Sequence, residues 1–455
     1  MPKGIDRRQL LQGGLGSMAA AISWQPGWSA MSAPRWQNWS GHLQANPAWQ
    51  VYPQTLTELR TVMRNAPGPI RPVGASHSFA PLCPTSGCQV HLDNMRGLVA
   101  VNPQRQRARL RAGTTVRELG PLLAEQGLAL SNQGDVDPQT LAGATGTSTH
   151  GTGLSLGSFS SMVTAAQLLT AQGELIEINA NDHPDWLPAV SCHLGVLGIV
   201  TELELQLRPS YRLEEVIEVL PLKDVLADLS SLLRDNRHFE FFVFPYSDRV
   251  LVKRLNETTA AVTPKPRIEI PEDQIFSLLT ELGHDVSPLD GPLQQLLTAV
   301  LPDSRRVGPS YEIFPSARST RFNEMEYELP LEQGAEVLAQ VIDAIRRRDI
   351  NVMFPLEVRS VAADAGWISP FYRRTALAIS VHQWAQADHK PLFQAVEPLL
   401  QQHLGRPHWG KMHTLKARDF AERYPRFEDF ARLRAELDPG AKLLTAPLKE
   451  MLVLA

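Results

Sequence analysis

The stretch RPVGASHSF, residues 71–79, constrains the fold most strongly, because it interrupts an extended segment and sets a histidine among small side chains. Pro72 fixes its backbone φ and lacks an N–H donor, whereas Gly74 tolerates left-handed backbone. With little bulk around His77, a flat ligand can approach this loop closely. The residues predicted to contact that ligand are Pro72, Val73, Gly74, Ala75, Ser76, His77 and Ser78.

A second glycine-rich run spans residues 134–157 and reads GDVDPQTLAGATGTSTHGTGLSLG. Backbone N–H groups in such a run can line an anion. Together with the first stretch, the run predicts binding of a dinucleotide diphosphate. The predicted contacts here are Gly134, Gly143, Ala144, Gly146, Thr147, His150, Gly151 and Gly153. For His150 we expect local hydrogen bonding beside the diphosphate rather than metal ligation.

Length, charge and missing motifs narrow the class of protein. A chain of 455 residues with 43% hydrophobic content exceeds the roughly 250–300 residues of one core, so two domains are expected. The net charge of −4, with dispersed Lys and Arg, offers no basic surface to nucleic acid or an anionic membrane. The sequence lacks a G-x-x-x-x-G-K-[ST] loop and a G-x-G-x-x-G after a strand, which argues against nucleoside-triphosphate hydrolysis and a Rossmann cofactor. A small-molecule substrate is the more natural partner.

Metal and disulfide signals are weak. The thirteen histidines lack clustered spacing and the three cysteines fit no common zinc pattern, so no metal is predicted. Cys83, Cys88 and Cys192 are too few for a disulfide framework. A local Cys83–Cys88 pair and free thiols stay equally open, since export would place both in an oxidising compartment.

The N-terminus predicts export. Arg7 and Arg8 precede Gln-Leu-Leu, a weakly apolar run at residues 13–23 and small residues around Ala30, which together resemble a twin-arginine signal. We expect residues 1–33 to direct the chain to the periplasm. A disordered basic tail is the alternative, since short motifs match by chance. The run is too short for a permanent membrane span, so no stable membrane insertion is expected.

The change of pattern after Pro209 predicts a first domain at 40–210 and a second at 211–405, followed by a C-terminal segment at 406–455. Helices are predicted at residues 55–64, 115–126, 225–233, 332–348 and 391–404. Strands are predicted at residues 98–101, 107–111, 162–170, 175–178, 196–207, 239–244 and 325–329. Residues 255–315 are rich in proline and predict loops with one or two helices.

Two strand-like stretches present polar side chains on one face. In residues 354–359, Glu357 and Arg359 alternate with apolar neighbours and therefore project together. A surface salt bridge is the commoner fate of such a pair, but the apolar flanks favour a protected face. In residues 376–382 the same alternation directs His382 toward a surface of small residues. A structural role and a catalytic role both stay open for this histidine.

The segment RPHWGK, residues 406–411, restrains a lysine. Pro407 limits the approach, Trp409 provides a rigid wall and Gly410 permits a sharp turn before Lys411. From spacing alone, Lys411 would more often be a solvated surface lysine.

Seven motifs, in this order, cover nearly everything after the first forty residues: RPVGASHSF, GATGTSTHGTG, GVLGIVTELEL, RFNEMEYELP, PLEVR, HWGK and DPGAKLL. This set resembles the sugar-alcohol and aldonolactone oxidases of the vanillyl-alcohol-oxidase class. The resemblance implies a two-domain α+β fold, with an FAD-binding domain of the PCMH type at 40–210 and a cap domain at 211–405. It also implies that the C-terminal segment at 406–455 returns to the FAD-binding domain. It also implies FAD carried covalently by His77 through the ring's 8α-methyl, with further FAD contacts at Gly198, Ile199 and His408.

The resemblance further implies the reaction. A carbinol of a polyol or lactone would pass a hydride to flavin N5, with oxygen as the electron acceptor. The implied catalytic residues are Glu357 and Arg359 on substrate hydroxyls, and Lys411 near the flavin. Lys411 would stabilise negative charge at the N1–C2=O edge, and deprotonation of the alcohol stays open as its alternative role. His382, which the strand alternation places on a polar face, is a further catalytic candidate. Two alternatives stay open: a dehydrogenase with a protein or quinone acceptor, and a non-catalytic flavin-binding protein.

Overall fold

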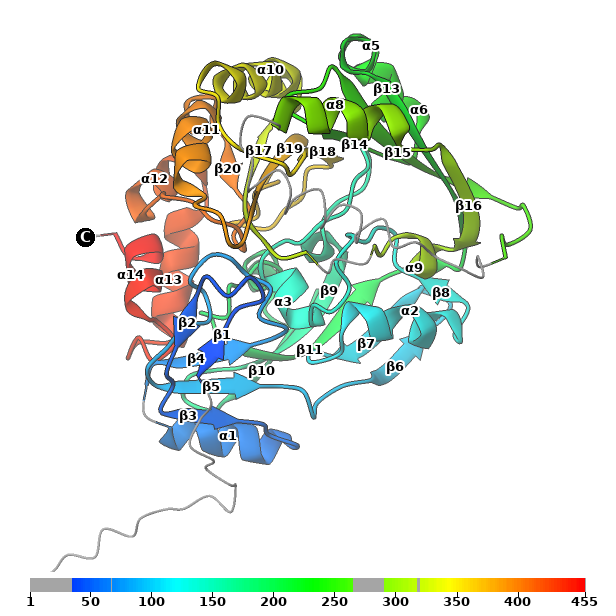
Figure 1. Cartoon of the computed structure of the whole chain (residues 1–455). Coiled ribbons are helices and arrows are strands. Elements are labelled where there is room, and N and C mark those ends of the chain that lie inside the picture. The colour runs from blue at the N-terminus through cyan, green and yellow to red at the C-terminus, as the bar shows by residue number, and fades with distance from the viewer. Residues whose placement is uncertain (1–34, 67, 265–289, 317–319, 455) are drawn as a thin grey trace, which may run out of the picture. The chain divides into compact units, whose positions relative to one another are not determined.

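Three main sheets, with helices packed against them, organise the part of the chain that a computed structural model describes, residues 35–66, 68–264, 290–316 and 320–454 (Figure 1). All of these residues belong to one unit, Ala33–Ala455. The mixture of helices and strands confirms the predicted α+β class.

The smallest of the three sheets is parallel and leads into the loop at residues 74–79. Its strand order is β3-β5-β4, with β3 at Trp49–Val51, β5 at Cys88–His91 and β4 at Ile70–Val73. A separate strand pair precedes it, β1 at Trp36–Gln37 and β2 at Gln44–Ala45. Helix α1 (Leu56–Asn65) begins where the Thr55 hydroxyl accepts a hydrogen bond from the Glu58 N–H, which confirms the predicted helix.

The second sheet is antiparallel, with the order β10-β9-β11-β7-β6. Its strands are β6 (Leu98–Asn102), β7 (Arg107–Arg111), β9 (Val163–Leu169), β10 (Leu175–Ile178) and β11 (Ile199–Gln206). The four predicted strands before residue 196 are confirmed. The fifth begins at Ile199 instead, because Gly195 and Gly198 both adopt positive φ and break the extended run.

Shorter elements connect the strands of this second sheet. They are α2 (Val116–Ala124), β8 (Leu128–Ala129), α3 (Leu141–Gly146) and α4 (Leu187–Val190). Strand β12 (Arg208–Pro209) follows β11 and pairs with β8. Thr115 and Glu118 form a capping box that starts α2, as the predicted helix at 115–126 requires. The Thr140 hydroxyl accepts from the Gly143 N–H and starts α3.

The largest sheet is antiparallel and eight-stranded, in the order β16-β13-β15-β14-β18-β19-β17-β20. Its strands are β13 (Arg212–Pro221), β14 (His238–Val243), β15 (Arg249–Thr258), β16 (Ser304–Pro309), β17 (Phe322–Pro330), β18 (Leu356–Val361), β19 (Ala376–Trp384) and β20 (Arg406–Pro407). Strand β14 lies inside the sheet, as its apolar sequence predicts. Helices α10 (Leu331–Arg347) and α11 (Lys390–Gln402) pack on each other, and α10 packs on β17 and β19.

The expectation of loops and helices at residues 255–315 is wrong at two places, where the structure has strands. Strand β15 continues to Thr258, and β16 pairs with β13 over Ser304–Pro309. Because β16 is an edge strand, its terminal proline costs no ladder hydrogen bond. The helical elements there are α8 (Asp290–Val300) and α9 (Ser310–Ile313), and residues 265–289 lie outside the described residues. The helix predicted at 225–233 is two short ones, α5 (Leu222–Ala227) and α6 (Leu229–Asp235).

The C-terminal segment contacts both the eight-stranded sheet and the three-stranded parallel sheet. It begins as edge strand β20 and continues through α12 (Ala417–Arg423), α13 (Phe427–Leu437) and α14 (Ala446–Leu452). The Ile70 N–H donates to the Lys442 carbonyl over 2.8 Å, and Arg71 Nη1 donates to the Leu443 carbonyl over 2.9 Å. The segment therefore braces the strand that carries the His77 loop.

The open cysteine question is resolved in favour of free thiols at Cys83, Cys88 and Cys192. Among the described helices, none is long and apolar enough to cross a membrane.

Candidate active site

A cleft lies between the loop at residues 71–79, helix α3 and the end of the largest sheet that carries β17 and β20. Its empty volume, counted to the open mouth, is about 1230 Å³. Its lining includes these predicted ligand contacts: Pro72, Val73, Gly74, Ala75, Ser76, His77, Ser78, Gly143, Gly146, Thr147, Ile199 and His408. Lys411 and Glu324 line the same cleft.

The loop is held in a tight conformation by its neighbours. Ser76 has a φ of 59°, and its carbonyl accepts from the Trp39 N–H over 2.8 Å. A Cβ on Gly74 would meet the Thr140 hydroxyl at 2.4 Å, so a larger residue there would displace the hydroxyl that starts α3. Within the described chain, the backbone N–H groups of residues 75–78 find no hydrogen-bond acceptor. A consecutive row of unused donors beside a long cleft fits the diphosphate of a dinucleotide.

The His77 ring is half-buried and neutral. It stacks on Trp39 with ring centroids 5.2 Å apart. Burial, and next the nearby charge of Lys411, lower the pKa of His77 to about 4. A ring nitrogen of His77 therefore carries a free lone pair near neutral pH.

Six of the predicted ligand contacts lie away from the cleft lining: Gly134, Ala144, His150, Gly151, Gly153 and Gly198. The glycines among them permit close packing of backbone on backbone. A Cβ on Gly151 would lie 2.2 Å from the Gln133 carbonyl oxygen. The Gly153 N–H donates to the Ser360 carbonyl over 2.8 Å, which ties the glycine-rich run to β18.

A row of buried acids on β17 faces the glycine-rich run. Glu324, Glu326 and Glu328 alternate with Met325, Tyr327 and Leu329, and each acid is at most 3% exposed. Strand pairing sets Glu324 opposite His382 and Glu326 opposite Ser380 on β19. The sequence prediction missed all three acids, although their period of two between apolar residues was the signal that could have found them.

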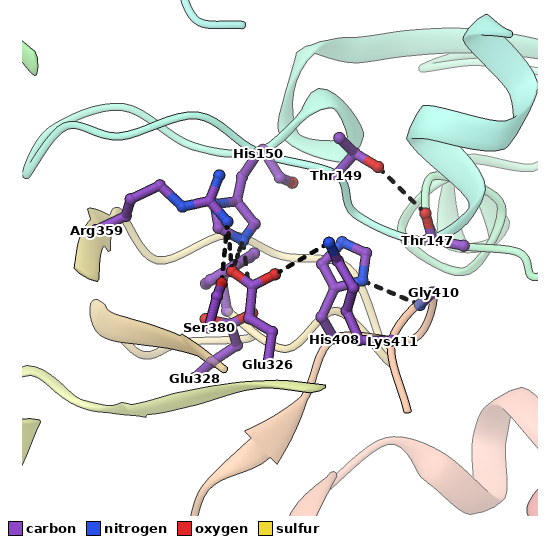
Figure 2. Close-up of polar contacts among 12 residues, drawn as sticks. Thr147, Thr149, His150, Glu326, Glu328, Arg359, Ser380, His408, Gly410 and Lys411 are labelled. Carbon is purple, nitrogen blue, oxygen red and sulfur yellow. Dashed lines mark hydrogen bonds and ion pairs between the residues drawn. The ribbon is translucent and has the colours of Figure 1, made fainter. Parts of the chain in front are cut away.

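Arg359 joins this acid row to Glu357, as Figure 2 shows for Glu326. Its Nη2 lies 2.6 Å from Glu326 Oε1, and its Nε lies 3.5 Å from Glu357 Oε1. Glu357 and Arg359 are 6% and 8% exposed, so the protected face is confirmed and the surface salt bridge is wrong. Burial lowers the pKa of Arg359, but Glu357 and Glu326 outweigh burial and raise it, so the guanidinium stays charged.

Lys411 stands where the cleft meets the acid row. Its Nζ forms an ion pair with Glu324 and lies 3.8 Å from Glu326 Oε2. Burial raises the pKa of Glu324, but Lys411 and then His382 outweigh burial and lower it to about 2. The Phe79 N–H donates to the Gly410 carbonyl over 2.6 Å, which fixes the HWGK turn against the His77 loop.

His382 and His408 are each fixed by a backbone group. His382 Nδ1 lies 3.0 Å from the Pro355 carbonyl, while its Nε2 lies 3.4 Å from Glu324 Oε1 and 3.9 Å from Glu357 Oε2. The ring is thus anchored at one nitrogen and faces two carboxylates with the other. His408 Nδ1 accepts from the Gly410 N–H over 3.0 Å, and burial lowers the pKa of His408 to about 3.

His150 makes the expected local contact and an unexpected one. Its Nδ1 lies 2.8 Å from the Gly151 carbonyl, but its Nε2 lies 3.2 Å from Glu326 Oε1 and 3.5 Å from Glu328 Oε1 (Figure 2). Burial and Arg359 lower the pKa of His150, but Glu326 and Glu328 outweigh them and raise it to about 9. His150 therefore belongs to the charged interior of the site.

Among the residues that the structure describes, two clusters have donor atoms spaced closely enough to hold a metal ion: His150, Glu326 and Glu328, and Asp135, Glu240 and Glu357. Each cluster already contacts a side-chain cation. Arg359 pairs with Glu326 in the first, and Lys253 pairs with Glu240 in the second. The absence of a metal stays a prediction.

Known proteins resemble this chain over most of its length. The sequence model of an FAD binding domain matches residues 47–179, and that of D-arabinono-1,4-lactone oxidase matches residues 203–451. L-gulono-1,4-lactone dehydrogenase of Mycobacterium tuberculosis is 36% identical over 420 residues, covering 90% of this chain and 97% of that protein. Alditol oxidase of a Streptomyces species is 27% identical over 431 residues, covering 91% and 98%.

The fold has a solved counterpart in cholesterol oxidase from Brevibacterium sterolicum, with a TM-score of 0.76 at 16% identity, covering 92% of this chain and 96% of that one. The fold and the cleft thus define an FAD-dependent oxidoreductase of the PCMH type. The chain belongs to the D-arabinono-1,4-lactone oxidase family. The predicted resemblance and the FAD cofactor are confirmed.

Proposed function

We propose that this enzyme oxidises a carbinol of an aldonolactone or a sugar alcohol. The observation that carries the proposal is the buried face on which Glu357, Arg359 and His382 adjoin the Glu324–Lys411 pair at the cleft. Relatives named as a lactone dehydrogenase and an alditol oxidase support the same substrate class.

Glu357 and Arg359 bind the substrate's hydroxyls in complementary ways. Glu357 accepts and Arg359 donates hydrogen bonds, so together they hold neighbouring hydroxyls in a fixed orientation. Among the described residues, the buried Glu357 Oε1 and Arg359 Nε have no hydrogen-bond partner. An apolar alcohol would leave both atoms without one, at a cost of roughly 1–3 kcal/mol for each such group. A polyhydroxylated substrate is therefore preferred.

Two other residues act on the proton and on the developing negative charge. Bound FAD supplies the hydride acceptor. His382 Nε2, between Glu324 and Glu357, takes the hydroxyl proton from the reacting carbinol. Lys411, held by Glu324 beside the cleft, places a fixed positive charge where negative charge develops.

We assign oxygen as the electron acceptor and His77 as the point of covalent FAD attachment. The neutral, cleft-lining imidazole of His77 supports the attachment, because a free lone pair is what bond formation requires. A dehydrogenase with a protein or quinone acceptor is the second candidate, supported by the name of the 36%-identical relative. Export by the twin-arginine signal is also proposed, from Arg7 and Arg8, which lie outside the described residues.

Turnover of a substrate panel tests the proposal. The panel holds aldonolactones, sugar alcohols and apolar alcohols of matched size, assayed with oxygen and, separately, with an artificial electron acceptor. We expect oxygen consumption with a polyhydroxylated substrate. Turnover with the artificial acceptor alone would select the dehydrogenase, and turnover with neither would leave only a flavin-binding role.

A further inference from the structure

A second charged cluster lies behind Glu357, on the side away from Lys411. Glu240 on β14, Asp135 in the loop before α3, and Glu357 each bring a carboxylate oxygen within 4.8 Å of the other two. Lys253 Nζ lies 2.9 Å from Glu240 Oε1 and 3.1 Å from Asp135 Oδ1. These contacts continue the polar face of the sheet beyond the residues assigned to substrate.

The cluster reaches the surface at two places. The Asp135 side chain is 12% exposed, whereas those of Glu240 and Lys253 are 5% and 8% exposed. Lys253 also lies 4.0 Å from Glu215, which pairs with the half-exposed Arg306. A line of ionisable groups therefore runs from Glu357, through Glu240, to the partly exposed Asp135.

Glu240 is the member suited to hold a proton. The charged groups that face it are Lys253 on β15, Asp135, and Glu357 with its strand neighbour Arg359 on β18. Burial raises its pKa, Lys253 opposes the rise, and Asp135 and Glu357 add to it, which leaves the pKa of Glu240 at about 7. A group of this pKa both accepts and releases a proton near neutral pH.

We propose that Glu240 and Asp135 form the route by which the substrate's hydroxyl proton leaves the active site. The proposal rests on the proposed function, since only carbinol oxidation supplies that proton. As the C–H bond gives up its hydrogen with both electrons to FAD, the O–H bond breaks and its electron pair completes the carbonyl. The proton left on His382 or Glu357 passes to Glu240, then to Asp135, and then to water.

The distances fit a relay rather than a purely structural ion pair. Gaps of up to 4.8 Å between carboxylates are spanned by one water molecule. Lys253 has three carboxylates within 4.0 Å of its Nζ, and each additional buried carboxylate raises the desolvation cost. Release of a proton through shared carboxylates explains why so many converge behind Glu357.

Infrared spectroscopy of the substrate-free holoenzyme tests the proton-holding group without turnover. We expect the carbonyl stretch of a protonated carboxyl to titrate near pH 7 and to be missing from Glu240→Gln. The matched control is Glu214→Gln on β13, whose carboxylate pairs with Arg305 instead. No protonated carboxyl titrating between pH 6 and 8 in the unaltered protein would overturn the proposal, whether or not the variants fold.

Anaerobic rapid mixing with a pH-indicator dye tests the relay itself. In the unaltered enzyme and in Glu214→Gln, one proton should appear together with the loss of flavin absorbance. In Glu240→Gln, proton release should slow by roughly tenfold or more relative to that loss, while Glu240→Asp should restore part of the rate. If the flavin absorbance of Glu240→Gln is lost while proton release is unchanged, the relay is overturned and the proposed function stands. Should no polyol or lactone remove the flavin absorbance, the proposed function fails, and the relay with it.

Discussion

The Lys411 ammonium forms an ion pair with the Glu324 carboxylate, and the Met412 N–H beside it donates to the Glu324 carbonyl over 2.9 Å. Side chain and backbone together dock the HWGK turn on β17, the strand that carries the buried acids. A lysine that sequence spacing alone would leave in solvent is thereby only 20% exposed and held at the cleft. Its charge is fixed before any substrate arrives, which is the condition for electrostatic stabilisation without reorganisation.

Replacing Lys411 with Met should slow flavin reduction at saturating substrate by roughly 10²–10³-fold, the usual loss for one stabilising donor. The substrate's apparent dissociation constant should change much less, because the charge matters most as negative charge develops. Anaerobic stopped-flow absorbance measures both quantities. The matched control is Lys416→Met, a 70% exposed lysine five residues further on. If the flavin in Lys411→Met is reduced as fast as in the unaltered enzyme, HWGK is a structural motif only.

Glu357→Gln should weaken substrate binding. The amide keeps the shape of the side chain but loses the charge that accepts from a hydroxyl, so KM should rise roughly tenfold or more, as a charge-assisted hydrogen bond of about 1.5–3 kcal/mol implies. Steady-state kinetics on a series of substrates with successive hydroxyls removed would locate the contact. An equal loss on every member of the series would contradict direct binding by Glu357.

His77→Ala should abolish covalent attachment while leaving some FAD bound, because the unused N–H groups of residues 75–78 and the lining of α3 persist. Acid precipitation separates the two states, since covalent flavin stays with the polypeptide. Colour that leaves the unaltered protein entirely with the supernatant would rule out attachment through His77. Bound flavin in the variant, measured before precipitation, reports whether the cleft itself survives.

Stability should fall as pH rises through the titration of His150. The folded-state pKa of His150, about 9, lies above its usual 6.5. Its contribution to the free energy of unfolding is therefore complete below pH 6.5 and is lost as pH rises toward 9. The shift corresponds to at most about 3 kcal/mol. Thermal unfolding of the holoenzyme between pH 6.5 and 9 should show a decline in Tm that His150→Gln reduces. Parallel pH profiles for the two proteins would show that His150 is not charged in the fold.

Arg7 and Arg8 should be required for export. Changing both to Lys preserves the charge but not the guanidinium geometry, so delivery across the membrane should fail. Fractionation of cells that express either form measures this, with Lys3→Arg as the control. Periplasmic delivery of the double-lysine form at the normal level would refute the export hypothesis.

Much of this architecture is predictable from local pattern. The Thr55 cap, the alternation around Glu357 and Arg359, and the apolar character of β14 each reflect near neighbours in sequence. What sequence could not supply is pairing across the sheet. His150 contacts Glu326 and Glu328, which lie 176 and 178 residues further along the chain. No residue near His150 in the sequence indicates these contacts. Glu240 likewise resembles an ordinary strand residue until β15 and β18 bring Lys253 and Glu357 beside it.

The glycine-rich run shows the limit of motif spacing. Gly143 and Gly146 line the cleft, whereas Gly151 and Gly153 pack against protein backbone. Both pairs look alike in sequence, because a close approach to a ligand and a close approach to another strand need the same missing Cβ. Only the fold separates the two uses.

The absorbance spectrum of the purified protein, followed anaerobically during titration with aldonolactones and sugar alcohols, tests the central claim most directly. We expect at least one polyhydroxylated carbinol to remove the oxidised-flavin absorbance completely, while apolar alcohols of similar size leave it unchanged. A flavin spectrum that no lactone or polyol alters, in a protein whose FAD a chemical reductant still bleaches, would contradict the assignment of this cleft to carbinol oxidation.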